Sequence, residues 1–117
     1  MKRDVVVLLT RAPYGRVHVP EGLRAARGVA AGFDRHDVAV AFVEDGVYAA
    51  RAAVDREALN VPGHIADLLT EGGEMVVDAA AMADRGVDET EVADDVAVES
   101  GESIAERVRA ADHTLDF

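Results

Sequence analysis

The feature that most constrains the fold of this chain is a series of short, uninterrupted apolar runs separated by segments with helical spacing. Residues 5–9 read Val-Val-Val-Leu-Leu, and residues 38–43 and 75–77 form two more runs of this kind. An apolar run without polar alternation is typical of a strand buried on both faces, as in the middle of a parallel sheet. Residues 96–98 and 114–117 predict two shorter strands nearer the end of the chain.

Helices are expected between these strands. The spacing of apolar residues, together with capping residues and glycines, predicts five helices. The first begins near Glu21 and ends at Gly32, the second covers residues 47–54, and the third runs from Pro62 to the glycines at 72–73. The fourth covers residues 79–85 before Gly86, and the fifth ends at Ala111. The last of these helices has two candidate starts, because Ser100 and Ser103 both suit an N-cap. Residues 11–20 should form a loop, and residues 88–95 a loop or a frayed helical turn.

Strands that alternate with helices predict an α/β fold with a mostly parallel sheet and helices on both faces. A chain of 117 residues without a linker predicts one domain over residues 1–117. Aromatic residues make up only 4% of the chain, so Val, Ala and Leu must build the core. Because there is no cysteine, disulfides and thiolate metal sites are excluded, and stability must come from packing, helped by subunit contacts.

The chain is strongly acidic, with a formal net charge of −11. Such a surface repels nucleic-acid phosphates and anionic membranes, so direct nucleic-acid or membrane binding is not expected. Lys2 is the only lysine beside eleven arginines. Acid-rich, lysine-poor composition favours a protein adapted to concentrated salt, where carboxylates are screened from one another over about 3 Å at 1 M salt. The alternative is an ordinary acidic protein of the cytosol.

No apolar stretch approaches the roughly 20 residues that a membrane span requires. The apolar run at residues 5–9 is too short for the core of a signal peptide and lacks a cleavage site of small residues after it. We therefore expect a cytoplasmic protein.

Sequence motifs for common cofactors and nucleophiles are absent. The chain has no G-x-G-x-x-G, no G-x-x-x-x-G-K-[ST] and no G-x-S-x-G. The four histidines, at positions 18, 36, 64 and 113, show no metal-ligand spacing. The sequence therefore predicts no cofactor and no metal site.

Position in the fold is the remaining guide to a site, because ligands of open parallel α/β sheets bind beyond the carboxyl ends of the strands. The residues there that could line a pocket are Tyr14, Arg16, His18, Asp45 and Asp78. Each also has a purely structural interpretation. The first three can be loop surface, Asp45 can belong to a turn or an N-cap, and Asp78 can cap the helix after it, which is worth about 1 kcal/mol.

Several motifs occur along the chain in a characteristic order: APYG at residues 12–15, EGL at 21–23, AFVEDGVY at 41–48, AAAMADRGVD at 79–88 and ADHTLDF at 111–117. Together they resemble the DsrE/DsrF-like family of sulfur-relay proteins, most closely its TusC/DsrF branch. The resemblance implies a three-layer α/β/α domain with about five mostly parallel strands. It also implies trimers or hexamers, built from one chain type or from DsrE-like paralogues.

Some members of this family carry persulfide sulfur on a cysteine at the end of the strand before the Ala-rich helix. The resemblance assigns that position to Asp78. A carboxylate cannot form a persulfide, and no other residue of the chain can, since there is no cysteine. The TusC/DsrF branch is the one whose subunit is not regarded as the main sulfur carrier.

Three hypotheses follow. The first is a non-catalytic subunit of a TusBCD- or DsrEFH-like sulfur-relay complex, which shapes the pocket of a cysteine-bearing paralogue. The second is a self-assembling, homo-oligomeric binding module that holds a small ligand or a partner protein at the strand ends. The third is an enzyme with Asp78 or Asp45 as general base beside His18 or Arg16, although no sequence spacing brings these groups together. The choice between tRNA thiolation and sulfur oxidation stays open.

Overall fold

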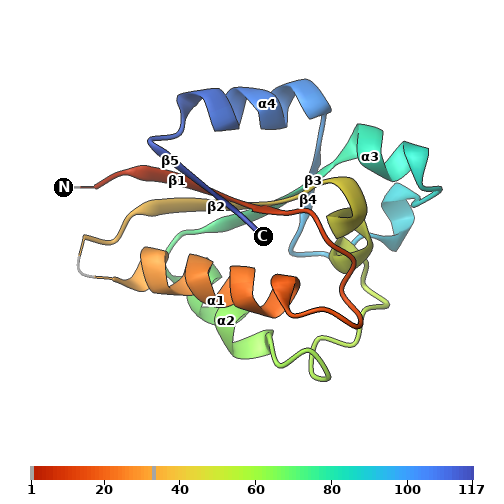
Figure 1. Ribbon diagram of the computed structural model, residues 1–117, viewed down its shortest axis with the longest axis horizontal. Helices are drawn as coiled ribbons and strands as arrows, with labels where there is room; N and C mark the ends of the chain where they lie inside the picture. Colours follow the sequence, from red (N-terminus) through yellow and green to blue (C-terminus); the bar gives the residue numbers. More distant parts are fainter. Residues whose placement is uncertain (1, 33) are drawn as a thin grey trace.

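A five-stranded, all-parallel sheet forms the middle of the computed structural model, which describes residues 2–32 and 34–117 (Figure 1). The strands lie in the order β4-β3-β2-β1-β5. Their bounds are β1 (Asp4–Leu9), β2 (Asp37–Phe42), β3 (Glu74–Asp78), β4 (Ala97–Glu99) and β5 (His113–Asp116). The predicted parallel α/β sheet is confirmed.

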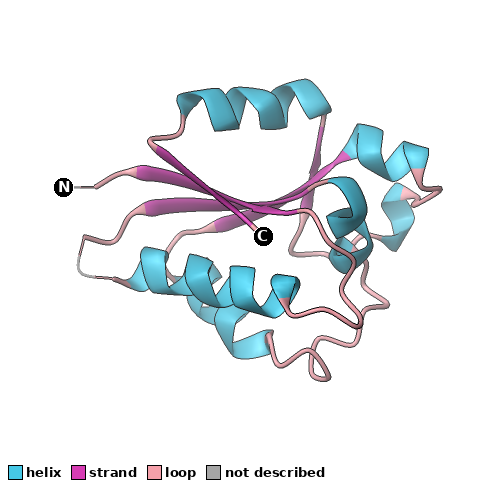
Figure 2. Cartoon of the chain, in the orientation of Figure 1, coloured by secondary structure: helices cyan, strands magenta, loops and turns pink. Residues whose placement is uncertain are grey.

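Helices cover both faces of the sheet, which gives three layers (Figure 2). They are α1 (His18–Ala31), α2 (Pro62–Thr70), α3 (Ala79–Asp84) and α4 (Gly101–Ala110), with two 3-10 helices, η1 (Glu44–Ala50) and η2 (Glu89–Glu91). Helices α1 and α2 lie side by side below the sheet in this view, and α4 lies alone above it. Within the described ranges, no helix is long and apolar enough to cross a membrane.

Alternate residues of each strand enter two cores of unequal size, because successive side chains of a strand point to opposite faces. The larger core lies against α1 and α2, and its fully buried side chains include Val7, Leu9, Leu23, Val40, Phe42, Leu68, Met75 and Val77. The smaller core, under α4, consists of Val6, Ala41, Val76 and Ile104. The central strands β1, β2 and β3 are therefore buried on both faces, although a single helix of 10 residues covers one of these faces.

Helix α1 begins at His18, earlier than the predicted start near Glu21. The expected loop over residues 11–20 is therefore wrong in its last three residues. Pro20 lies inside the first helical turn, where its missing N–H costs nothing because that donor has no partner within the helix. Val17 precedes the helix without any side-chain cap, so the sequence contains no capping signal at the true start.

The segment after β2 also differs from the prediction. A helical piece was expected over residues 47–54, but a 3-10 helix occupies Glu44–Ala50. It starts early because Glu44 adopts a left-handed backbone, with φ of 49°, and the Gly46 amide then donates to the Val43 carbonyl at 2.8 Å. This turn sets η1 directly against the carboxyl end of β1.

The remaining helices agree closely with the sequence patterns. Helix α2 begins at Pro62, and α3 follows Asp78 directly. Residues 88–95 contain η2, whose start is a capping box between Asp88 and Glu91. Of the two possible starts of α4, Ser100 is the N-cap, since its Oγ accepts a hydrogen bond from the Ser103 amide at 3.1 Å.

Candidate functional site

Asp78 ends β3 and caps α3. Its Oδ1 accepts a hydrogen bond from the Ala80 amide at 2.9 Å, the interaction expected of an N-cap aspartate. The same oxygen would lie 3.4 Å from a Cβ built on Gly101, so the carboxylate also faces the first residue of α4. The amino ends of two helices thus meet at this side chain, and both favour negative charge there.

Asp45, the second strand-end carboxylate, is held in an ion pair. The Nε of Arg85 donates to Asp45 Oδ1 at 2.9 Å, and the Nη1 of Arg85 lies 3.3 Å from the Ala81 carbonyl. The hydrogen bond that Arg85 donates to the Asp45 carboxylate raises the pKa of Arg85. This pair joins η1 to the end of α3, so Asp45 has a structural role that spans two elements.

Tyr14 and Arg16 lie on the loop between β1 and α1. The Tyr14 hydroxyl accepts a hydrogen bond from the Asp55 amide at 2.9 Å, which fastens this loop to the segment before α2, although the residue as a whole is 54% exposed. Arg16 is exposed and forms no ion pair with any described residue.

His18 is the one residue of the five predicted that lines a described cavity at the strand ends. This cavity of about 590 Å³ opens at the carboxyl ends of β1, β2 and β5, and its lining also includes Thr10, Arg11, Glu44, Asp116 and Phe117. The Nδ1 atom of His18 is buried without a hydrogen-bond partner. A buried ring nitrogen without a partner is uncommon in a folded protein and calls for an explanation.

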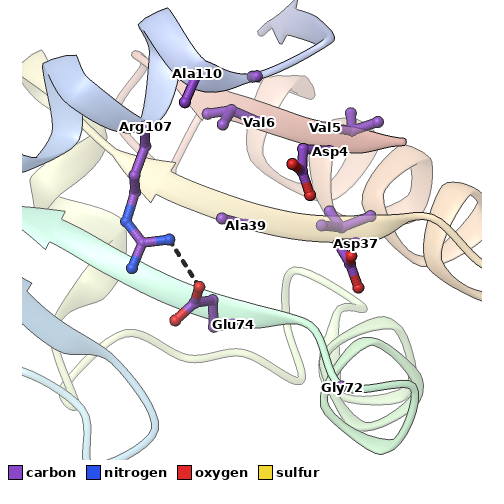
Figure 3. Close-up of a pocket in the computed structure, with 11 residues that line it drawn as sticks. Asp4, Val5, Val6, Asp37, Ala39, Gly72, Glu74, Arg107 and Ala110 are labelled. Carbon is purple, nitrogen blue, oxygen red and sulfur yellow. Dashed lines mark hydrogen bonds and ion pairs between the residues drawn. The ribbon is translucent and has the colours of Figure 1, made fainter. Parts of the chain in front are cut away.

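A second cavity, of about 320 Å³, lies at the opposite, amino ends of the strands under α4 (Figure 3). Asp4 and Asp37, which are register partners at the starts of β1 and β2, both line it. Arg107 extends from α4 and binds Glu74 at 2.7 Å and Glu99 at 2.6 Å. The hydrogen bond from Arg107 lowers the pKa of Glu99. Arg107 thereby ties α4 to two neighbouring strands, which is a structural role.

The chemistry available at the carboxyl edge is therefore limited. Within residues 2–32 and 34–117, no cluster of three or more His, Asp or Glu side chains is arranged to hold a metal ion. Asp45 and Asp78 have different partners, and neither is hydrogen-bonded to His18 or Arg16. What the edge offers is an anion-favouring backbone at Asp78 and, separately, the cavity beside His18.

Sequence reasoning missed the other seven residues that line this cavity, namely Leu8, Thr10, Arg11, Val43, Glu44, Asp116 and Phe117. These residues come together because β5 lies next to β1. That neighbour relation cannot be read from alternating strands and helices, because several strand orders suit the same alternation.

An open, parallel, five-stranded sheet with helices on both faces defines this protein as a three-layer α/β/α protein with its candidate sites at the carboxyl edge. The chain belongs to the DsrE/DsrF-like family, whose family model matches residues 3–117. The match to this family confirms the resemblance described from the sequence motifs, and the family is associated with sulfur relay.

Solved structures of two proteins have the same fold. The YchN protein from E. coli is 22% identical, with a TM-score of 0.82 and complete coverage of both chains. MTH1491 from Methanobacterium thermoautotrophicum, described as a protein of unknown function, is 16% identical, with a TM-score of 0.76, and the match covers 99% of this chain and 100% of that one. No curated protein sequence matches the chain significantly.

Proposed function

We propose that this chain is a non-catalytic subunit of a sulfur-relay complex of the TusBCD or DsrEFH kind. The observation that carries the proposal is the state of position 78, where the family resemblance expects a sulfur-carrying cysteine. An aspartate that caps α3 occupies it, and the chain has no cysteine at any other position. Membership of the DsrE/DsrF-like family supports the sulfur-relay context.

The geometry around Asp78 suits a subunit that has kept the frame of a sulfur site without its reactive atom. In a relative with cysteine at this position, the same helix amino ends would favour the thiolate over the thiol and so activate the sulfur. In this chain a carboxylate occupies the position of the thiol, and the Ala80 amide donates a hydrogen bond to one of its oxygens. A carboxylate has no sulfur to accept or pass on, so its role there is to stabilise α3.

The uneven coverage of the sheet supports assembly with other subunits. Helix α4 alone covers its face of the sheet, over a small core of four buried residues. Val17 is 68% exposed at the start of α1. Exposed apolar groups of this size are suited to subunit contacts, and we propose trimers or hexamers with cysteine-bearing, DsrE-like paralogues.

Co-purification tests this proposal directly. The tagged chain should be isolated from its own cells in their native salt, and its partners identified by mass spectrometry. We expect a stable partner of the same family that carries a cysteine at the position of Asp78. Persulfide transfer from that partner should be slower when the chain is absent. A chain recovered only with copies of itself, or a partner that transfers sulfur equally well alone, would contradict the proposal.

A homo-oligomeric binding module is the second candidate function. The observation that favours it is the cavity at the ends of β1, β2 and β5, which contains charged side chains without partners among the described residues. Light scattering in high salt decides whether this chain assembles alone, and a monodisperse monomer would eliminate this candidate.

A further inference from the structure

The order of the strands creates a switch point between β1 and β5. The chain leaves β1 through α1, on the lower face of the sheet, and enters β5 from α4, on the upper face (Figure 1). The strand order reverses here, because the chain proceeds from β1 outward to β4 on one side and then crosses back to β5 on the other side of β1. In open α/β sheets, ligands bind in the crevice beyond the carboxyl ends of the strands at such a point.

The cavity of about 590 Å³ lies at this crevice. Thr10 and Arg11 follow β1, His18 begins α1, Glu44 follows β2, and Asp116 ends β5. Asp78 is not among the lining residues, because β3 is separated from β1 by β2. The crevice is therefore a different place from the position of the family cysteine.

Four arginines, at positions 11, 16, 35 and 51, form no ion pair with a described carboxylate, and Arg11 is the one of these four that lines the cavity. Seven of the eleven arginines, at positions 3, 24, 27, 56, 85, 107 and 109, form ion pairs. His18 lines the same cavity as Arg11, although its unpartnered Nδ1 atom is itself buried. Arg11 is thus the basic group of this cavity that is available to bind a carboxylate.

The same crevice also contains acidic side chains. Glu44 and Asp116 line it, and neither carboxylate has a partner among the described side chains. A purely anionic ligand would be repelled by these two groups, and a purely cationic ligand would be repelled by Arg11. The partly buried Leu8 and Val43 supply apolar surface between them.

We propose that this crevice binds a small zwitterion, namely a free α-amino acid with an apolar side chain. Its carboxylate binds Arg11, its ammonium group binds Asp116 and Glu44, and its side chain packs on Leu8 and Val43. The Thr10 hydroxyl already donates to the Phe117 carbonyl at 3.1 Å, so it holds the end of β5 against β1 as one wall of the site. The proposal gives the binding-module candidate its ligand class and rests on that candidate.

Three matched compounds test the need for both charges. The ¹⁵N-labelled protein is titrated with L-leucine, with 4-methylpentanoate, which lacks the amino group, and with 3-methylbutylamine, which lacks the carboxylate. We expect leucine to shift the amide resonances of Thr10, Arg11 and Asp116 saturably. Each truncated compound should bind about tenfold more weakly or worse, because a charge-assisted hydrogen bond is lost. Equal binding of either truncated compound, or no shift with leucine at millimolar concentration, would overturn the proposal.

Variants locate the site. Arg11→Gln should weaken leucine binding about tenfold or more. Arg35→Gln is the matched control, because Arg35 is also exposed and without an ion pair among the described residues but precedes β2 at the opposite edge of the sheet. Both side chains are exposed, so both variants should keep the amide spectrum of the folded protein. Unchanged leucine binding in Arg11→Gln would refute the site, while the co-purification result for the subunit proposal would stand unaffected.

Discussion

Replacing Asp78 tests whether this carboxylate acts as a helix cap in the place where a sulfur carrier would have its thiol. Asp78→Ala removes the acceptor of the Ala80 amide and leaves that donor unpaired at the start of α3. Loss of an N-cap side chain costs about 1 kcal/mol of unfolding free energy. In a chain of 117 residues this corresponds to a fall in Tm of about 4 °C. Urea denaturation at a fixed protein concentration measures the difference.

Asp78→Asn is the matched control for this prediction. Asparagine keeps an oxygen acceptor of the same length and is about as good an N-cap as aspartate, so this variant should retain nearly all the stability. If Asp78→Asn loses as much stability as Asp78→Ala, the negative charge rather than the cap is what matters. If Asp78→Ala loses nothing, the capping argument is wrong.

Asp78→Cys extends the test from stability to chemistry. Because the wild-type chain has no cysteine, every thiol signal of this variant comes from position 78. The helix amino ends at this position should hold the pKa of the new thiol below the ordinary value of about 8.5. The pH dependence of alkylation by iodoacetamide gives this pKa. A value at or above that of free cysteine would contradict the claim that the backbone here favours an anion.

Three further predictions concern the frame around the sites. Gly46→Ala should unfold the protein or destabilise it by about 3 kcal/mol or more in urea denaturation, since the new Cβ would overlap the backbone at the end of β1. In α1, Gly28→Ala should stabilise the folded protein by up to about 1 kcal/mol, because the new Cβ meets open space. Gly22→Ala should stabilise the protein less or destabilise it, because its Cβ would meet the buried side chain of Leu9. Thermal melts compare the stabilities of the two variants. The hydrogen bond from Arg56 lowers the pKa of Asp95, so this carboxylate stabilises the fold above its unfolded pKa of about 3.9 and loses that contribution as the pH falls through its folded value. The stability difference between wild type and Asp95→Asn should therefore shrink in urea titrations below about pH 4.

The strands and the Asp78 cap could be predicted because their signals are local. An apolar run marks a buried strand wherever it occurs, and an aspartate directly before an alanine-rich segment satisfies the first free amides of a helix within two residues. The start of α1 failed for the complementary reason. Val17 supplies no capping side chain, and Pro20 resembles a loop residue although the first turn of a helix tolerates it.

The roles of Asp45 and Gly46 depend on long-range contacts, which the sequence does not reveal. Asp45 read as a turn residue, but its partner is Arg85, 40 positions away. Gly46 read as the second half of the same turn, yet its essential property is the absence of a Cβ beside the Leu9 carbonyl. Neither contact leaves a pattern in the neighbouring residues, because the first depends on η1 lying against the end of α3 and the second on η1 lying against the end of β1.

Substitutions at Asp78 and at Arg11 should have separate effects, because the two residues lie at the ends of different strands. Changes at Asp78 act through α3 and should alter stability and assembly while leaving leucine binding at the β1–β5 crevice intact. Changes at Arg11 remove an exposed charge that supports no described side chain, so they should alter leucine binding and leave assembly intact. A double variant should then show the sum of the two effects, as expected for sites that share no partner. Coupling between them would mean that the edge works as one site, with β2 and η1 transmitting changes from one strand end to the other.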